Sequence, residues 1–156
     1  MKLSIIIPVY NEEKFIGKTI EKVMVADTSG LTKEIIVVDD GSVDKTVESI
    51  KYKVAGIKKQ NGCSVFTIFK KKNEGKGAAL RDGFMKSTGD IVLVQDADLE
   101  YDQSDYPTLL EPFLKKNADV VYGSRFISDR PHRVLYFWHS VINRFLTMLS
   151  NIFTNL

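Results

Sequence analysis

LSIIIPVYNEE, residues 3–13, decides the fold. Its apolar part, residues 3–9, is a continuous run rich in β-branched side chains and closed by a proline, which is typical of a strand buried on both faces in a parallel sheet. Asn11 can cap a helix that follows directly, and Glu12 and Glu13 suit its positive end. One apolar face of this helix is expected to contain Phe15, Ile16, Ile20, Val23 and Met24. The stretch therefore predicts a buried strand followed by a helix.

The same alternation continues along the chain. Further strands are expected within residues 34–42 and at 64–69, 91–94 and 119–122. The expected helices are one capped by Ser42 or Asp44 that carries Val47, Ile50 and Val54, one entered through Gly75 and Gly77 with Ala78, Ala79, Leu80 and Phe84 facing inward, and one near 104–116. Strands that alternate with helices at this spacing predict an α/β fold, a doubly wound and mostly parallel sheet with flanking helices.

Composition excludes several classes of protein. The chain has 156 residues, a net charge of +2 and a single cysteine, so disulfide scaffolds and zinc modules are excluded. The near-neutral charge also argues against a duplex nucleic-acid binder. The N-terminal apolar run is broken by Pro8 and is too short for a signal peptide or a membrane span, which places the protein in the cytoplasm.

Residues 126–156 have a different pattern and are expected to be an amphipathic helical segment. Its apolar stripe contains Val134, Leu135, Phe137, Trp138, Val141, Ile142, Phe145, Leu146, Leu149, Ile152 and Phe153. With arginines nearby, this stripe can lie in the interface at the cytoplasmic face of a membrane. Packing on the sheet or on another domain is the slightly favoured alternative. The chain ends without a helix-ending signal, which is typical of a piece of a longer protein.

Polar residues gather where the expected strands end. They are Pro8, Tyr10 and Glu12 after the first strand, Asp39, Asp40 and Ser42 after the second, Asn73, Gly75, Lys76 and Gly77 after the third, and Asp96, Asp98 and Glu100 after the fourth. Open parallel sheets bind ligands at the carboxyl ends of strands, near the point where the strand order reverses. With the order 3-2-1-4, the four loops can converge on one ligand.

The segment QDADLE, residues 95–100, is the strongest of these signals. Asp96 and Asp98 are one residue apart at the end of a buried strand, so one carboxylate can face a divalent cation and the other a ribose hydroxyl or the same metal. Glu100 can join the ligands. Oxygen ligands with space for water and phosphate oxygens suit Mg²⁺ or Mn²⁺. For an isolated Asp-x-Asp, capping of the helix near Ser104 is the commoner explanation, but the preceding strand and the earlier aspartate pair favour the metal.

Two glycine-containing turns give weaker signals. In DDGSVD, Asp39 or Asp40 can accept hydrogen bonds from a base or a ribose, and Gly41 lets the backbone pass close to the ligand. An ordinary strand-to-helix turn explains this segment equally well. In NEGKGAAL, backbone amides at a helix start and Lys76 can hold a diphosphate or an acidic loop. A simple helix entry is at least as good an explanation there.

The basic residues fall into two groups. The run Lys70–Lys72 is expected to be a solvated strand end. Arg125 directly follows the expected strand at 119–122, so its guanidinium can face the same crevice and bind a phosphate through two hydrogen bonds. His139 is expected to be structural or on the surface.

Five segments together carry a resemblance to a known family. They are IIIPVYNEE (5–13), VVDDGSVDKT (37–46), NEGKGAALRDGF (73–84), GDIVLVQDADLE (89–100) and VVYGSRF (120–126). The chain resembles the family-2 nucleotide-sugar glycosyltransferases with the Rossmann-like GT-A fold, and among them the polyprenyl-phosphate sugar synthases. The resemblance implies a nucleotide-sugar-binding domain at 1–125, and a segment at 126–156 that leads into an acceptor region.

The resemblance also implies roles for individual residues. The residues expected to contact the nucleoside are Pro8, Tyr10, Glu12, Asp39 and Asp40, with Lys76 close by. The expected metal ligands are Asp96, Asp98 and Glu100, and the residues expected to act in catalysis are Asp98 and Arg125. A second phosphate contact is expected from one of four residues, Arg130, Arg133, His139 and Arg144.

The implied activity is that of an inverting, metal-dependent hexosyltransferase, which moves a hexose from a UDP- or GDP-sugar to a polyprenyl phosphate such as dolichyl or undecaprenyl phosphate. A phosphate acceptor is already an anion near neutral pH, so orientation replaces a catalytic base. Transfer to a saccharide hydroxyl is an alternative, which requires a carboxylate base. A base beyond Leu156 would leave this chain an inactive fragment. A non-catalytic nucleotide-sugar-binding module is the other alternative.

Overall fold

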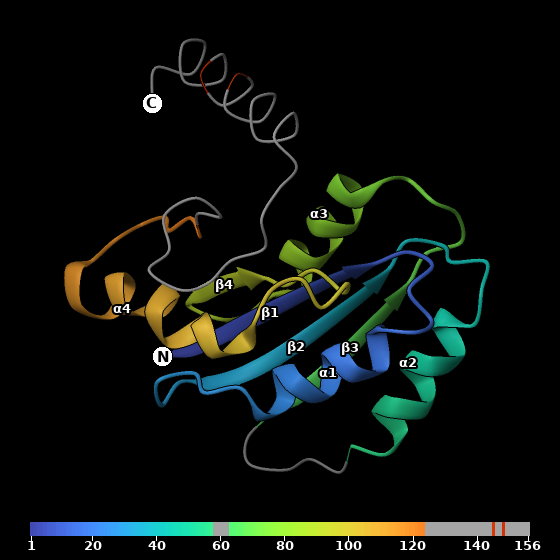
Figure 1. The fold of residues 1–156 in the computed structure, drawn as a ribbon, viewed down its shortest axis with the longest axis horizontal. Coiled ribbons are helices and arrows are strands. Elements are labelled where there is room, and N and C mark those ends of the chain that lie inside the picture. The colour runs from blue at the N-terminus through green and yellow to red at the C-terminus, as the bar shows by residue number, and fades with distance from the viewer. Residues whose placement is uncertain (58–62, 124–144, 146–147, 149–156) are drawn as a thin grey trace. The chain divides into compact units, whose positions relative to one another are not determined.

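The computed structural model of the chain describes residues 1–57, 63–123, 145 and 148. The chain divides into two compact units, Met1–Val121 and Tyr122–Leu156, and the sheet belongs to the first. Its strands are β1 (Lys2–Val9), β2 (Thr32–Asp39), β3 (Ser64–Phe69) and β4 (Ile91–Val94) (Figure 1). Its helices are α1 (Ile16–Val25), α2 (Thr46–Ala55), α3 (Lys76–Lys86), the 3₁₀ helix η1 (Gln103–Asp105) and α4 (Tyr106–Lys116).

The four strands form one parallel sheet in the order β3-β2-β1-β4 (Figure 1). Ile5 of β1 lies in register with Ile35 of β2 on one side and with Leu93 of β4 on the other. The chain runs outward from β1 to β3 and then returns to the far side of β1, so the strand order reverses between β1 and β4. The predicted α/β class is confirmed, and the strands have the order 3-2-1-4 under which the four loops were expected to converge.

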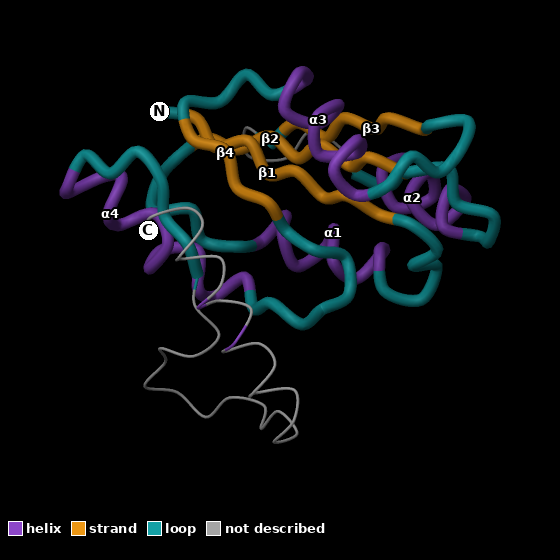
Figure 2. Tube along the Cα trace, turned by 90° about the horizontal axis from the view of Figure 1, so that it is seen from above, coloured by secondary structure: helices purple, strands orange, loops and turns teal. Residues whose placement is uncertain are grey.

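Helices cover both faces of the sheet, which explains why β1 and β2 are continuous apolar runs. Figure 2 shows α3 on one side of the strands and α1 on the other. The larger core cluster joins alternate residues of β1 and β2 to Ile16, Ile20 and Val23 of α1, Ile50 of α2, and Tyr106 and Leu110 of α4. The smaller cluster joins the intervening strand residues Ile6, Ile36 and Val38 to Ala79 of α3.

The starts of the first two helices differ in part from expectation. Asn11 does not cap α1, which begins at Ile16. Asn11 instead adopts a left-handed backbone conformation, with φ 55°, and its side chain accepts a hydrogen bond from the N–H of Val43 at 3.0 Å. The prediction was wrong because a loop-to-loop contact takes the Asn11 side chain. At α2 the N-cap residue is Lys45, so neither Ser42 nor Asp44 holds the expected position, although Asp44, one residue earlier, accepts a hydrogen bond from the N–H of Thr46 at 3.0 Å.

The inner face of α3 also differs from expectation. Phe84 is 48% exposed, whereas Gly83 is buried against β1. A Cβ atom at Gly83 would lie 2.5 Å from the Cγ2 atom of Ile6, so the helix and the strand approach each other at this glycine. Ala79 and Gly83 are one turn apart and share the inner face, and Phe84, one position further on, is turned away from it. The expectation of an inward Phe84 was therefore wrong.

Residues 119–122 do not form the expected fifth strand. Val120 and Tyr122 are 64% and 87% exposed, and this segment has no strand partner among the described residues. A β-branched sequence becomes a strand only where a neighbouring backbone supplies hydrogen bonds, and no described segment supplies them to residues 119–122. Of the expected helical tail, the structure describes Phe145 and Met148, which are helical and about half exposed. Within the described part of the chain, no helix is both long and apolar enough to cross a membrane.

Candidate functional site

A cleft of about 300 Å³ lies at the carboxyl ends of the strands. It is lined by the carboxyl end of β1, by the segments that follow the four strands, and by the first turn of α3. The lining residues are Pro8, Val9, Tyr10, Glu12, Asp40, Asn73, Lys76, Ala79, Asp96, Ala97 and Asp98. The cleft therefore lies where the reversal of strand order predicts a ligand site.

Most of the expected site residues meet in this cleft. Those that line it are Pro8, Tyr10, Glu12, Asp40, Lys76, Asp96 and Asp98. Asp39 and Glu100 are not among the lining residues. Arg125 lies outside the described residues, as do Arg130, Arg133, His139 and Arg144.

Hydrogen bonds connect the loop after β1 to the loop after β2. The N–H of Asn11 donates to Oγ of Ser42 at 2.9 Å, and the N–H of Glu12 donates to Oγ1 of Thr46 at 2.8 Å. Together with the contact between Asn11 and Val43, these bonds fix the backbone on which Tyr10 and Glu12 stand. These hydrogen bonds have no signal in the local sequence, because they join residues more than thirty positions apart.

The loop after β4 is held by contacts from two helices. Oγ1 of Thr19 in α1 donates to the carbonyl oxygen of Ala97 at 2.8 Å, and the bond is buried. The buried hydroxyl of Tyr106 in α4 donates to Oε1 of Gln95 at 2.8 Å. Nε2 of Gln95 in turn donates to the carbonyl oxygen of Asp96 at 3.0 Å. Burial raises the pKa of Tyr106, which keeps its hydroxyl protonated and available as this donor. The two candidate metal ligands thus stand on a supported backbone.

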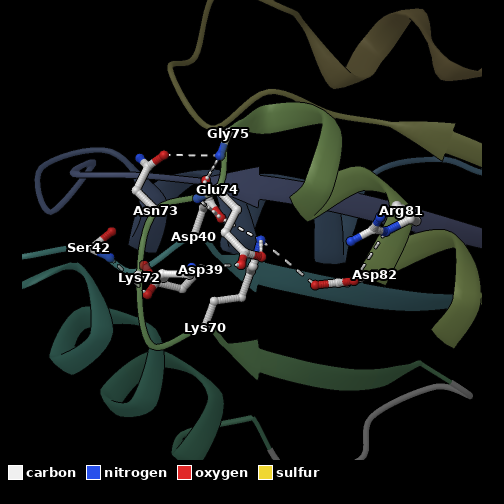
Figure 3. Close-up of polar contacts among 10 residues, drawn as sticks. All are labelled: Asp39, Asp40, Ser42, Lys70, Lys72, Asn73, Glu74, Gly75, Arg81 and Asp82. Carbon is white, nitrogen blue, oxygen red and sulfur yellow. Dashed lines mark hydrogen bonds and ion pairs between the residues drawn. The ribbon is translucent and has the colours of Figure 1, made fainter.

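Asp40 holds the NEGKG loop in place (Figure 3). Its carboxylate, 2% exposed, accepts hydrogen bonds from the N–H of Gly75 at 2.7 Å and of Glu74 at 3.1 Å, and it forms an ion pair with Nζ of Lys70 at 2.8 Å. Burial alone would raise the pKa of Asp40, but the Lys70 and backbone hydrogen bonds outweigh it and lower the pKa. Asp40 is therefore an ionised support for the loop that carries Lys76.

Lys70 is not part of a solvated strand end. Its side chain is 9% exposed, and besides Asp40 it pairs with the carboxylate of Glu74 at 2.9 Å (Figure 3). Lys72, by contrast, is 80% exposed, as expected for the whole run. The prediction was wrong for Lys70 because its buried partner Asp40 comes from the loop after β2, which local sequence does not bring beside it.

Asp39 supports its own turn. Its Oδ2 atom accepts a hydrogen bond from the N–H of Ser42 at 3.2 Å, and the residue is 1% exposed. Gly41, with φ 74°, packs against the chain itself, since a Cβ atom there would lie 2.5 Å from the backbone carbon of Lys72. The need for glycine at this position thus comes from the close approach of two loops, whereas the sequence suggested the approach of a ligand.

The acidic residues of the cleft repel one another. The pKa of Glu12 is raised by burial first, and then by the negative charges of Asp98 and Asp44. Asp96 forms an ion pair with Lys76, whose Nζ atom lies 2.6 Å from Oδ1 of Asp96. A cation near these carboxylates relieves their repulsion.

The expected trio of metal ligands is only partly assembled. Oδ1 of Asp98 accepts a hydrogen bond from the N–H of Glu100 at 3.1 Å, and Leu99 between them is left-handed, with φ 63°. Among the described residues, no group of three or more acidic, histidine or cysteine side chains is arranged to hold a metal. Asp96 and Asp98 both line the cleft, and two carboxylates with phosphate oxygens and water are a common set for Mg²⁺ or Mn²⁺. The residues present therefore fit such an ion as a pair.

Asn73, expected in one of the four converging loops, lines the cleft, whereas Val9, Ala79 and Ala97 line it without having been expected there. Oδ1 of Asn73 accepts a hydrogen bond from the N–H of Gly75 at 3.0 Å, which shapes the entry to α3. An asparagine two residues before a glycine is a signal for such a turn. For Ala79 no local signal exists, because a small buried residue looks the same whether it faces a core or a cleft.

Comparison with known proteins agrees with this geometry. The family model described as glycosyl transferase family 2 matches residues 4–153. A dolichol-phosphate mannosyltransferase of Pyrococcus furiosus is 32% identical over 157 residues, which cover 97% of this chain and 41% of that protein. An undecaprenyl-phosphate 4-deoxy-4-formamido-L-arabinose transferase of Pseudomonas paraeruginosa is 36% identical over 110 residues, which cover 70% of this chain and 31% of that protein. The chain thus spans less than half the length of these relatives.

A solved structure with a similar fold is the mannosyltransferase PcManGT of Pyrobaculum calidifontis in complex with GDP-Man and Mn²⁺. It is 26% identical, with a TM-score of 0.54, over 62% of this chain and 27% of that chain.

Proposed function

Because the chain belongs to glycosyl transferase family 2, we propose that its cleft binds a nucleotide diphosphate hexose and that the protein transfers the hexose, with inversion, to a polyprenyl phosphate. The observation that carries the proposal is the cleft itself, in which Asp96, Asp98 and Lys76 meet at the reversal of strand order. The names of the two relatives, one with dolichol phosphate and one with undecaprenyl phosphate, support a lipid phosphate as the acceptor.

The donor is oriented by the cleft's own side chains. The half-exposed ring of Tyr10 offers a surface for a nucleoside, and the Glu12 carboxylate can accept hydrogen bonds from ribose hydroxyls. Asp40 contributes mainly by fixing the loop of Lys76, because its oxygens already accept two backbone N–H groups. The Lys76 ammonium supplies positive charge for the diphosphate at the N-terminus of α3, where backbone N–H groups favour an anion.

Asp96 and Asp98 are the residues that would hold Mg²⁺ or Mn²⁺. When bound, the ion offsets the negative charge that develops on the leaving nucleotide diphosphate. The Mn²⁺ and GDP-Man in the similar mannosyltransferase structure support this assignment. Glu100 remains the proposed third ligand, although the structure brings only the two aspartates to the cleft.

A lipid phosphate needs no residue to remove a proton before it attacks the sugar, because it is already an anion near neutral pH. The protein then has to hold the acceptor in line with the sugar carbon, which is a task of orientation. We assign the acceptor phosphate to Arg125, whose guanidinium suits two parallel hydrogen bonds to phosphate oxygens. The activity is proposed to take place at the cytoplasmic face of a membrane, where a lipid phosphate is found.

Thermal unfolding with nucleotide sugars tests donor binding by this chain. We expect GDP-mannose or UDP-glucose to raise the melting temperature with Mn²⁺ present, and much less without it. Asp98→Asn should remove the Mn²⁺-dependent part of the shift, because one ligand carboxylate is lost. Asp119→Asn, at an exposed position away from the cleft, is the matched control and should behave as the wild type. Equal shifts with Asp98→Asn and wild type would contradict the metal assignment, and no shift with any nucleotide sugar would contradict the proposed donor.

Turnover separates the enzyme from a non-catalytic binding module. Slow release of hexose from the donor in the presence of Mn²⁺ is expected of an enzyme, whereas binding without any release points to a module. Transfer of labelled hexose to undecaprenyl phosphate, compared with transfer to a saccharide acceptor, then identifies the acceptor class. Transfer to the saccharide alone would refute the lipid phosphate.

A further inference from the structure

The ion pair between Lys76 and Asp96 crosses the cleft. Lys76 is the first residue of α3, and Asp96 stands in the loop after β4, with 2.6 Å between Nζ of Lys76 and Oδ1 of Asp96. Both residues line the cleft. The Lys76 side chain is 59% exposed and that of Asp96 is 23% exposed, so solvent reaches the pair. This contact places a cation of the chain itself on a carboxylate assigned to the metal.

The charges that line the cleft are unequal. The lining carboxylates are Glu12, Asp40, Asp96 and Asp98, and Lys76 is the basic side chain among the lining residues. Asp40 is already paired with Lys70, so Lys76 remains as the cation for the other three. Without it, these carboxylates would repel one another more strongly. Lys76 thus offsets part of the negative charge of these carboxylates, as a metal ion bound there would.

A metal ion and Lys76 compete for the same atom. A metal ion coordinated by this oxygen of Asp96 would stand close to the ammonium that lies 2.6 Å from the same atom, and the two cations would repel each other. Metal binding at Asp96 therefore weakens the ion pair and favours release of the Lys76 ammonium. The ion pair is exposed, and exposed pairs are weak, so this exchange is inexpensive.

The Lys76 side chain is exposed, with 59% of its surface open to solvent, so it has room to change its conformation. The ammonium stands on a flexible four-carbon chain at the N-terminus of α3, the end of a helix that favours an anion. A diphosphate bound at this end of α3 lies within the reach of the displaced ammonium.

We propose that Lys76 is a tethered counter-ion that holds Asp96 in the ligand-free chain and transfers to the diphosphate of the donor when the metal takes Asp96. This inference rests on the proposed function, since it presupposes a metal and a nucleotide diphosphate in the cleft. Lys76 then has two opposite effects. It weakens the binding of the metal alone, and it strengthens the binding of the diphosphate.

Titration of Lys76→Gln with Mn²⁺ and with nucleotides tests both effects. Binding of Mn²⁺ without nucleotide is measured at low salt from the paramagnetic resonance signal of the free ion. We expect Lys76→Gln to bind Mn²⁺ about two- to fivefold more tightly than the wild type, the range for loss of an exposed ion pair. GDP or UDP, titrated by calorimetry at saturating Mn²⁺, should bind about tenfold more weakly, because a charge-assisted hydrogen bond is lost.

Lys72→Gln is the matched control. Lys72 is 80% exposed, lies in the same segment and does not line the cleft, so both affinities should stay within about twofold of the wild type. Lys76→Arg keeps the positive charge and should bind Mn²⁺ alone as the wild type does. The melting temperature of each variant, measured without ligand, shows that the fold is intact.

The outcomes separate the inference from the proposed function. If the wild type binds Mn²⁺ and nucleotide but Lys76→Gln binds Mn²⁺ equally or less tightly, the counter-ion role is refuted and the proposed function stands. Unchanged binding of nucleotide by Lys76→Gln likewise refutes the transfer to the diphosphate. If the wild type binds neither Mn²⁺ nor nucleotide, the proposed function and the inference both fail.

Discussion

We expect acid to destabilise the fold through one buried carboxylate, Glu34 of β2, which is 1% exposed. Glu34 lies near the amino ends of the strands and does not line the cleft. Its oxygens accept hydrogen bonds from Oγ of Ser4 at 2.6 Å and from the N–H of Thr88 at 2.7 Å, and they pair with Nζ of Lys2 at 2.6 Å. Burial would raise the pKa of Glu34, but the bonds from Lys2, Ser4 and Thr88 outweigh it and lower the pKa from 4.5 to about 2.

The size of the effect follows from this shift. A pKa that is lower in the folded than in the unfolded chain stabilises the fold at pH values above the unfolded pKa, and the stabilisation is lost as the pH falls from 4.5 toward about 2. At about 1.4 kcal/mol per pKa unit, the shift corresponds to about 3 kcal/mol. Lys2 is 36% exposed, so solvent screens its share and about 2–3 kcal/mol is expected.

Glu34→Gln removes this contribution. Urea unfolding, followed by circular dichroism, should give a free energy of unfolding about 2–3 kcal/mol lower for the variant at pH 7. The difference from the wild type should shrink as the pH approaches 2, because the wild-type carboxyl is then protonated and neutral like the amide. Comparing the two proteins at each pH cancels the titration of all other carboxylates.

A control and a second measurement make this test specific. Glu111→Gln breaks an exposed pair with Lys115 within one helix and should change the stability little. Nucleotide binding by Glu34→Gln at pH 7 should match the wild type, because Glu34 is not in the cleft. A variant as stable as the wild type at pH 7, or a difference that does not change with pH, would refute the reasoning.

Four further substitutions test the packing of the loops and of α3. Lys70→Met should weaken GDP or UDP binding at saturating Mn²⁺ in calorimetry, because the Asp40 support of the NEGKG loop loses its cation; unchanged binding would contradict that role. Gly83→Ala should lower the free energy of unfolding by about 1–3 kcal/mol through its 2.5 Å contact with Ile6, whereas Gly77→Ala, in open space, should be neutral or stabilising in the same urea titration. Gly41→Ala should reduce both the melting temperature and nucleotide binding, because its Cβ meets backbone at 2.5 Å; wild-type values would argue against the close approach of the two loops.

The alternation of strands and helices and the place of the cleft were predictable because both follow from patterns within short segments. An apolar run as long as one strand indicates a strand that is buried on both faces. A polar segment directly after such a run marks the edge of a parallel sheet where the strands end. Asp96 and Asp98 could be assigned to the cleft on this basis alone, since they directly follow β4.

The failures share a cause, which is that partners distant in sequence decide where a side chain goes. The sequence suggests a solvated Lys70, but Asp40, from the loop after β2, lies beside it and buries its ammonium in an ion pair. The sequence predicts a buried Phe84. In the structure Gly83 packs against β1 instead, which sets the rotation of α3 and leaves Phe84 exposed. The same holds for residues 119–122, whose apolar composition favours a strand but whose backbone has no strand partner among the described residues.

Lys76 in the cleft and Lys70 behind it differ in exposure, and this difference suggests different tasks for their carboxylate partners. Lys70 is 9% exposed and paired with Asp40, Glu74 and Asp82, so Asp40 stays paired and serves as a support. Lys76 is 59% exposed and tied to one, so Asp96 can exchange its ammonium for another cation. Breaking an exposed ion pair changes the stability of the fold little, whereas leaving a buried carboxylate without its cation strongly destabilises the fold. Asp40 therefore helps to maintain the shape of the cleft, and we propose that Asp96 is the carboxylate whose cation a ligand can replace.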